Sequence, residues 1–173
     1  MATTFKAIAT VTVGSGGASS IAFTSIPGTY TDLLLKLSIR TNRSGQDNDA
    51  LFISINSNTS NLSNKIIESI GSGTPSGYST SGATMKLAAL PGSTATASVF
   101  GNAEVYFPNY ANSNNKPFSA DSVTENNATQ AIAALTGNVW SDTSAITSLS
   151  LTPGYGTSFN QYSTATLYGI KNS

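Results

Sequence analysis

The sequence contains neither cysteine nor histidine, and this excludes several kinds of chemistry. Without cysteine the chain forms no disulfide and offers no thiolate to a metal. Without histidine it has no imidazole to bind zinc, to transfer protons, or to activate a serine or cysteine nucleophile. Stability must therefore come from packing and from association between subunits.

Charge is also scarce. Only 9% of the 173 residues are charged, and eight basic residues balance eight acidic ones, whereas ordinary globular proteins carry about 25% charged residues. Nucleic-acid binding needs a basic stripe that releases counterions. The basic residues here are scattered, and Arg40 and Arg43 are the only arginines. We therefore predict no nucleic-acid partner.

Targeting and nucleotide-binding signals are missing as well. The opening residues MATTFKAIAT lack the apolar core of a secretory signal. No apolar run approaches the roughly 18 residues that a membrane helix needs. No phosphate-binding GxxxxGK[ST] loop occurs. The sequence predicts a protein made in a cytoplasm, with no membrane partner and no cofactor.

What the sequence has instead is a repeated apolar alternation with a period of two, which is typical of half-buried β-strands. The clearest case is 31–41, TDLLLKLSIRT. There Leu33, Leu35, Leu37 and Ile39 are expected to face the core, and Leu34, Lys36, Ser38 and Arg40 to face outward. Further strands are expected within 4–13, 19–26, 50–56, 83–92, 96–110, 119–125, 129–140, 145–154 and 163–170.

Four segments need separate treatment. In 61–70, Leu62, Ile66 and Ile70 have helical spacing, although neighbouring strands favour a strand there. Segment 71–82 is rich in Gly and Ser and is expected to form an exposed loop, and 111–118 is expected to be a second loop. The terminal segment 163–170 is expected to be an integral strand of a sheet.

About eight to ten short strands with regular turn signals indicate an all-β fold. For this length we predict a single β-sandwich domain over residues 1–173, an antiparallel two-sheet jelly-roll-like sandwich. In the segment 4–13, the residues Phe5, Ala7, Ala9, Val11 and Val13 are expected to share its core face.

Carboxylates are the remaining candidates for catalysis or metal binding. Glu104, Asp121 and Glu125 are the acids most able to approach one another, as a glycosidase pair must, although they read more simply as solvated acids. Asp47 and Asp49 in QDND could bind calcium, but calcium takes six to eight oxygen ligands. The simpler interpretation is a loop that caps a turn with Asx hydrogen bonds.

Aromatic residues are concentrated late in the chain, at Trp140, Tyr155, Phe159 and Tyr162. Such a group could form a stacking platform for sugars, but more often fills a core or a subunit interface. We also expect Phe100, Tyr106 and Trp140 to be exposed. Because closed cyclic symmetry buries exposed apolar residues, we predict a homotrimer.

Three segments, 25–41, 105–118 and 137–171, resemble β-rich virion proteins of tailed bacteriophages. The shared features are an Ile-Pro-x-x-Tyr-x-x-Leu strand entry, an Asn-Tyr pair with a nearby Lys, a Trp before an Ile-x-x-Leu-x-Leu strand, and a final Leu-Tyr-Gly-Ile. The resemblance covers nearly the whole chain in the same order.

The resemblance implies a jelly-roll virion structural protein assembled in the host bacterial cytoplasm. It implies no catalytic residues, so we predict that the chain is not an enzyme. The favoured function is a capsid decoration (cement) protein bound to the phage major capsid protein. A tail or fibre module that binds a host receptor or glycan is the alternative, and a polysaccharide-cleaving enzyme is a third.

Overall fold

Strands make up most of the chain in a computed structural model that describes residues 4–127 and 129–171. They are β1 (Phe5–Thr12), β2 (Ile21–Phe23), β3 (Asp32–Ile39), β4 (Asn48–Ile55), β5 (Leu62–Ile70), β6 (Ser76–Tyr78), β7 (Lys86–Pro91), β8 (Gly101–Phe107), β9 (Lys116–Glu125), β10 (Ala131–Trp140), β11 (Leu149–Pro153) and β12 (Thr164–Ile170). The one helix within these residues is a 3-10 turn, Gly82–Thr84. No helix among them is long and apolar enough to cross a membrane.

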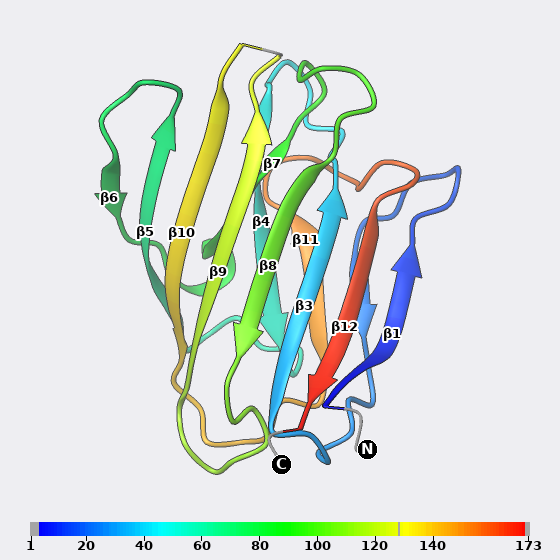
Figure 1. Cartoon of the computed structure of the whole chain (residues 1–173), viewed down its shortest axis with the longest axis vertical. Coiled ribbons are helices and arrows are strands. Elements are labelled where there is room, and N and C mark those ends of the chain that lie inside the picture. Colours follow the sequence, from blue (N-terminus) through cyan, green and yellow to red (C-terminus); the bar gives the residue numbers. More distant parts are fainter. Residues whose placement is uncertain (1–3, 128, 172–173) are drawn as a thin grey trace.

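The strands form two antiparallel sheets (Figure 1). The large sheet has the order β1-β12-β3-β8-β9-β10-β5-β6, and the small sheet has the order β2-β11-β4-β7. This order matches a jelly roll in which the β8–β9–β10 meander takes the place of the single strand between β3 and β5. Strands β1 and β12 extend the large sheet beyond β3.

The predicted all-β sandwich is therefore confirmed, with twelve strands where eight to ten were expected. One addition is β6, which lies inside the loop expected at 71–82. Segment 61–70 is the strand β5, which pairs with β10 and β6, and its alternate residues Leu62, Asn64 and Ile66 are buried. The second loop is shorter than expected, since β9 already begins at Lys116.

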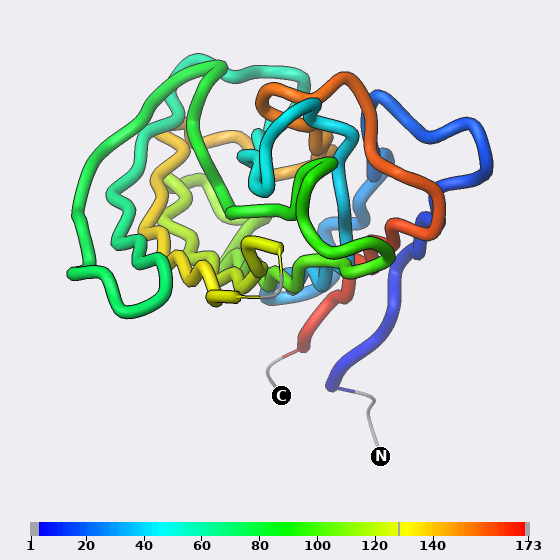
Figure 2. The backbone as a smooth tube through the Cα atoms, turned by 90° about the horizontal axis from the view of Figure 1, so that it is seen from above, coloured from blue at the N-terminus to red at the C-terminus, as the bar shows by residue number. Residues whose placement is uncertain are grey.

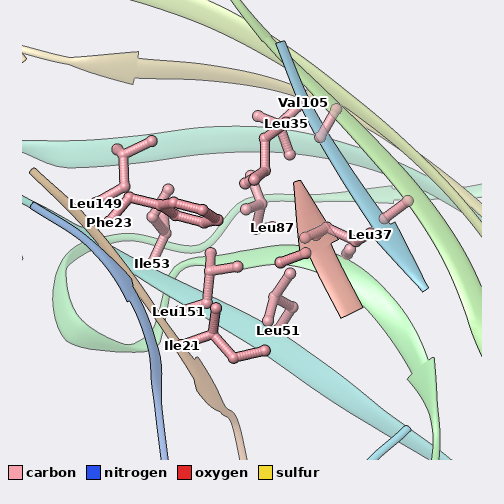
Figure 3. Close-up of a cluster of buried hydrophobic side chains, with 14 of the residues drawn as sticks. Ile21, Phe23, Leu35, Leu37, Leu51, Ile53, Leu87, Val105, Leu149 and Leu151 are labelled. Atoms are coloured by element: carbon pink, nitrogen blue, oxygen red, sulfur yellow. The ribbon is translucent and has the colours of Figure 1, made fainter. Parts of the chain in front are cut away.

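The core lies between the two sheets (Figure 3). Leu35 and Leu37 of β3 and Val105 of β8 come from the large sheet and are almost wholly buried. They face apolar side chains of the small sheet, which are Ile21, Phe23, Leu51, Ile53, Leu87, Leu149 and Leu151. The inward face predicted for β3 is thus correct. Leu34, expected to face outward, is also buried, with Tyr168 and Tyr106 as its cross-strand partners.

The first strand departs from simple alternation. A register shift between Ala7 and Ala9 interrupts its pairing with β12. Ile8 and Val11 pack against the core, whereas Phe5 is 43% exposed. The single core face predicted for 4–13 is therefore wrong, because a bulge reverses the facing of the residues that follow it.

The terminal strand is an interior member of its sheet. β12 pairs with β1 on one side and with β3 on the other. Figure 2 shows the same arrangement from above, with β1 and β12 side by side at one end of the sandwich. The expectation that 163–170 is a sheet strand is confirmed.

Candidate interaction surface

The outer face of the large sheet carries straight rows of side chains. Alternation along β9 sends Phe118 and Ala120 inward and Asp121 outward. Cross-strand partners lie directly opposite one another, so outward residues of neighbouring strands align across the sheet. One such row is Ile67, Leu135, Asp121, Glu104, Lys36, Thr166 and Thr10. The row is apolar at its β5 and β10 end and becomes ionic and then polar toward β1.

The apolar end of this face forms an exposed patch. Ile67 on β5, Val123 on β9 and Leu135 on β10 are 57%, 50% and 60% exposed. Ala131 and Ala133 on β10 are also exposed on this face. We call these five residues the apolar patch. Exposed groups of large aliphatic side chains are uncommon on monomers and mark interaction sites.

A shallow hollow of about 710 Å³ adjoins the patch. Val99, Phe100 and Glu125 line it together with Val123 and Ala131 of the patch. Its wall is the connection between β7 and β8, and side chains from the sheet hold that connection in place. The Glu125 carboxylate, for example, accepts hydrogen bonds from the Thr96 amide at 2.8 Å and the Thr96 hydroxyl at 3.0 Å.

The three acids considered for glycosidase chemistry occupy the outer face without forming a catalytic pair across a cleft. Glu104 and Asp121 are cross-strand partners on the open sheet surface. Lys36 makes an ion pair with Glu104. Glu125 lines the hollow, which contains neither of the other two acids. Glu104 and Asp121 thus lie side by side on one sheet, whereas the two carboxyl groups of a glycosidase flank the bond that is cleaved.

Asp49 has a structural function. Its side chain is buried, and its carboxylate accepts hydrogen bonds from the amides of Ala50 at 2.8 Å, Tyr155 at 3.0 Å and Gly156 at 3.0 Å. Among the described residues, no group of three or more acidic, His or Cys side chains could hold a metal. Asp49 therefore lies in β4 and not in the expected loop, and its carboxylate holds the distant segment at Tyr155 and Gly156 instead of a local Asx turn.

The late aromatic residues do not form one platform. Trp140 and Phe159 are fully buried, whereas Tyr155 and Tyr162 are 67% and 68% exposed. The expectation that Trp140 is exposed is wrong, because Trp140 is the last residue of β10 and its side chain is on the side of the strand that faces the core. Phe100 is only half-buried at the hollow, and Tyr106 is 36% exposed.

Lys116, which the sequence placed in a loop, lies buried beside Trp140. Its Nζ atom is 5.7 Å from the centre of the Trp140 ring and donates hydrogen bonds to the carbonyl groups of Asn114 and Asp142. Burial lowers the pKa of the Lys116 amine, and the nearby Asp142 carboxylate opposes that effect. Carbonyl partners and an aromatic face thus take the place of water around this cation.

A second group of aromatic and ionic side chains, in which Tyr78 and Tyr155 are exposed and the others are half-buried, lies where β7 of the small sheet meets β5 and β6 of the large one. We call it the side cluster, and it consists of Arg43, Phe52, Glu68, Tyr78, Lys86 and Tyr155. Asn64 of β5 fixes the start of β7, since its side-chain amide donates to the Lys86 carbonyl at 2.6 Å. The sequence gives no local signal for this cluster because its members come from four strands and two loops.

Comparison with known proteins adds little to this geometry. No protein-family model matches the chain, and no match to a curated protein was found. Two solved structures are weakly similar. One is the CBM2 module of Lactobacillus casei BL23 phage J-1 evolved Dit, at 10% identity and a TM-score of 0.22 over 89% of this chain and 69% of that chain. The other is alginate lyase A1-II′ of polysaccharide lyase family 7, at 9% identity and a TM-score of 0.22 over 94% and 66%.

Similarities at this level establish neither a common fold nor a common function. The relationship to phage virion proteins stays a prediction from the sequence.

Proposed function

We propose that the chain is a bacteriophage virion structural protein, a capsid decoration protein that binds the outer head surface and stabilises it. The observation that carries the proposal is the apolar patch. It is a solvent-exposed surface on the long paired strands β5, β9 and β10, and it contains Ile67, Val123 and Leu135. The resemblance of the sequence to phage virion proteins implies that the partner is the phage major capsid protein.

The physical properties of the patch suit repeated docking on a symmetric shell. Specific interfaces bury about 800 Å² on each partner, and many weak contacts on one particle gain strength by avidity. The patch is uncharged, so salt should screen its contacts only slightly. A rigid sheet also loses little conformational freedom when it docks.

The test uses heads that lack this protein. Such heads should assemble, but should release their DNA at a lower temperature than normal heads. Added parent protein should restore the heat resistance at both low and high salt. The Leu135→Lys variant should bind the heads at least about tenfold more weakly, because docking would remove a charged ammonium group from water where the parent has an apolar side chain.

Tyr162→Lys is the matched control for this substitution. Tyr162 is similarly exposed but does not belong to the patch, so its replacement should leave head binding unchanged. Equal head binding by Leu135→Lys and the parent would show that the patch is not the docking surface. Heads that lack the protein and are as heat-resistant as normal heads would refute the decoration function.

The alternative, a tail or fibre module that binds a host receptor or glycan, is favoured by one observation. The side cluster presents Tyr155 to solvent beside a cation and further aromatic rings. The same particles separate the two functions, since particles that resist heat normally but fail to adsorb to host cells would support the alternative.

Self-association into a homotrimer also stays a prediction. Its remaining basis is Tyr106, which is 36% exposed, and the half-buried Phe100, because Trp140 is buried. Light scattering at micromolar concentration should give three times the 17.7 kDa chain mass. A stable particle of one chain mass would contradict trimer formation in solution.

A further inference from the structure

Two tyrosines of equal exposure differ in how firmly they are held. Tyr155 and Tyr162 are 67% and 68% exposed. The Arg43 guanidinium lies 4.5 Å from the centre of the Tyr155 ring, and the centre of the Phe52 ring lies 5.9 Å away with the two ring planes at 70°. No ring or cation contact joins Tyr162 to any other described residue.

The backbone beneath Tyr155 is fixed as well. The buried Asp49 carboxylate accepts hydrogen bonds from the amides of Tyr155 and Gly156, both at 3.0 Å. The Arg43 guanidinium is itself anchored, because it donates to the Asn48 carbonyl at 2.9 Å. Holding a side chain in one conformation costs entropy. Tyr155 is therefore a preorganised ring whose remaining surface stays available to a ligand.

The remaining members of the side cluster continue this surface with hydrogen-bonding groups. Phe52 pairs in register with Lys86, and the Lys86 ammonium donates to Glu68 at 2.5 Å and to the Tyr78 hydroxyl at 3.2 Å. The Tyr78 hydroxyl donates to Glu68 at 2.6 Å. Burial, the Glu68 carboxylate and the Tyr155 phenol, in that order of importance, raise the pKa of Tyr78, which is consistent with two neighbouring phenols.

The ligand that matches this surface has an apolar face and a hydroxyl rim. A pyranose ring presents C–H groups on its face, which pack on an aromatic ring, and hydroxyl groups at its edge that both donate and accept. Arg43 and Lys86 are two positive charges, and Glu68 and the buried Asp49 are two negative ones. The balance favours a neutral ligand over the anionic backbone of a nucleic acid.

We propose that the side cluster is a binding site for neutral pyranose glycans, with one sugar stacked on Tyr155 and its hydroxyls contacting Arg43 and the Lys86–Glu68 pair. The site lies at the side of the sandwich, and Val123 and Leu135 of the apolar patch lie on other strands, β9 and β10. It does not depend on the proposed head binding. It would give either a head-bound or a tail-bound subunit a second, carbohydrate-directed contact.

The test is a titration of isotope-labelled protein, followed by amide and aromatic NMR shifts. The probes are neutral oligomers of glucose, galactose and N-acetylglucosamine, with an oligothymidylate as the anionic comparison. At least one neutral oligomer should shift the Tyr155 and Gly156 signals. Tyr155→Ala should weaken that binding about tenfold or more, whereas Tyr155→Phe should retain it because the ring is kept.

Tyr162→Ala serves as the matched control, since it removes an equally exposed ring outside the cluster and should leave the affinity unchanged. The proposal is wrong if no neutral oligomer shifts these signals at millimolar concentration, or if Tyr155→Ala binds as tightly as the parent. Tyr155-dependent binding of oligothymidylate alone would also overturn it. The Tyr155 variants should still bind heads, so a failure here leaves the decoration proposal standing.

Discussion

A chain truncated after Tyr162 should not fold. The missing segment contains β12, which supplies hydrogen-bond partners to both β1 and β3. It also contains Ala165 and Leu167, whose side chains are fully buried in the core between the sheets. Without β12 the first strand has no neighbour in the large sheet, and β3 becomes a long open edge that promotes aggregation.

Expression of the truncated chain and its circular dichroism would measure this effect, and we expect insoluble protein or a spectrum without β structure. Leu167→Ala gives a graded version of the same test. It should fold but lose about 3 kcal/mol of unfolding free energy, because it leaves a cavity in a close-packed core. Soluble truncated protein with the parent's spectrum and melting temperature would show that β12 is dispensable.

Alternation of apolar and polar residues in the sequence predicted the fold class because one face of each sheet is buried in the core. Along β3 and β9 every second side chain enters the core, so the pattern is directly visible. The prediction failed where a local irregularity resets the pattern, as between Ala7 and Ala9 in β1. The short edge strand β6 was missed because Ser76, Gly77 and Tyr78 are all exposed and carry no alternation.

The candidate sites were harder to predict because they depend on pairing between distant segments. Glu104 and Asp121 were correctly expected to approach one another, yet only the register shows that they lie on an open face. The Asp49 carboxylate accepts hydrogen bonds from Tyr155 and Gly156, which lie 106 and 107 positions later in the sequence. The apolar patch could have been inferred from the outward parity of Ile67 and Leu135 once their strands were aligned.

Arg40 illustrates the same limit. Alternation along 31–41 placed it on the solvent face, but it follows the last residue of β3 and its side chain is buried. Its guanidinium donates four hydrogen bonds to backbone carbonyls of the β7–β8 connection. The acceptors and distances are Thr96 at 2.7 Å, Val99 at 3.0 Å, Ser93 at 3.3 Å and Ala95 at 2.9 Å.

Replacing Arg40 with methionine should therefore destabilise the protein by about 3 kcal/mol, because hydrogen bonds from a charged donor are lost and buried carbonyls are left without partners. For a chain of this length that corresponds to a fall of roughly 10 °C in the melting temperature. Arg40→Lys should recover only part of the loss, since an ammonium group cannot reproduce the planar fork of a guanidinium.

Hydrogen exchange would separate a local effect from a general one. Arg40 holds the wall of the hollow beside the apolar patch, so the amides of residues 93–100 should lose protection first in Arg40→Met. Amides of β9 and β10, whose pairing does not involve Arg40, should change only with global stability. If exchange in both regions stays at the parent's rate and the melting temperature is unchanged, the four carbonyl contacts do not stabilise the connection. If residues 93–100 are selectively exposed, Arg40→Met should also weaken head binding through the patch, because Val99 and Phe100 would no longer form a fixed wall next to Val123.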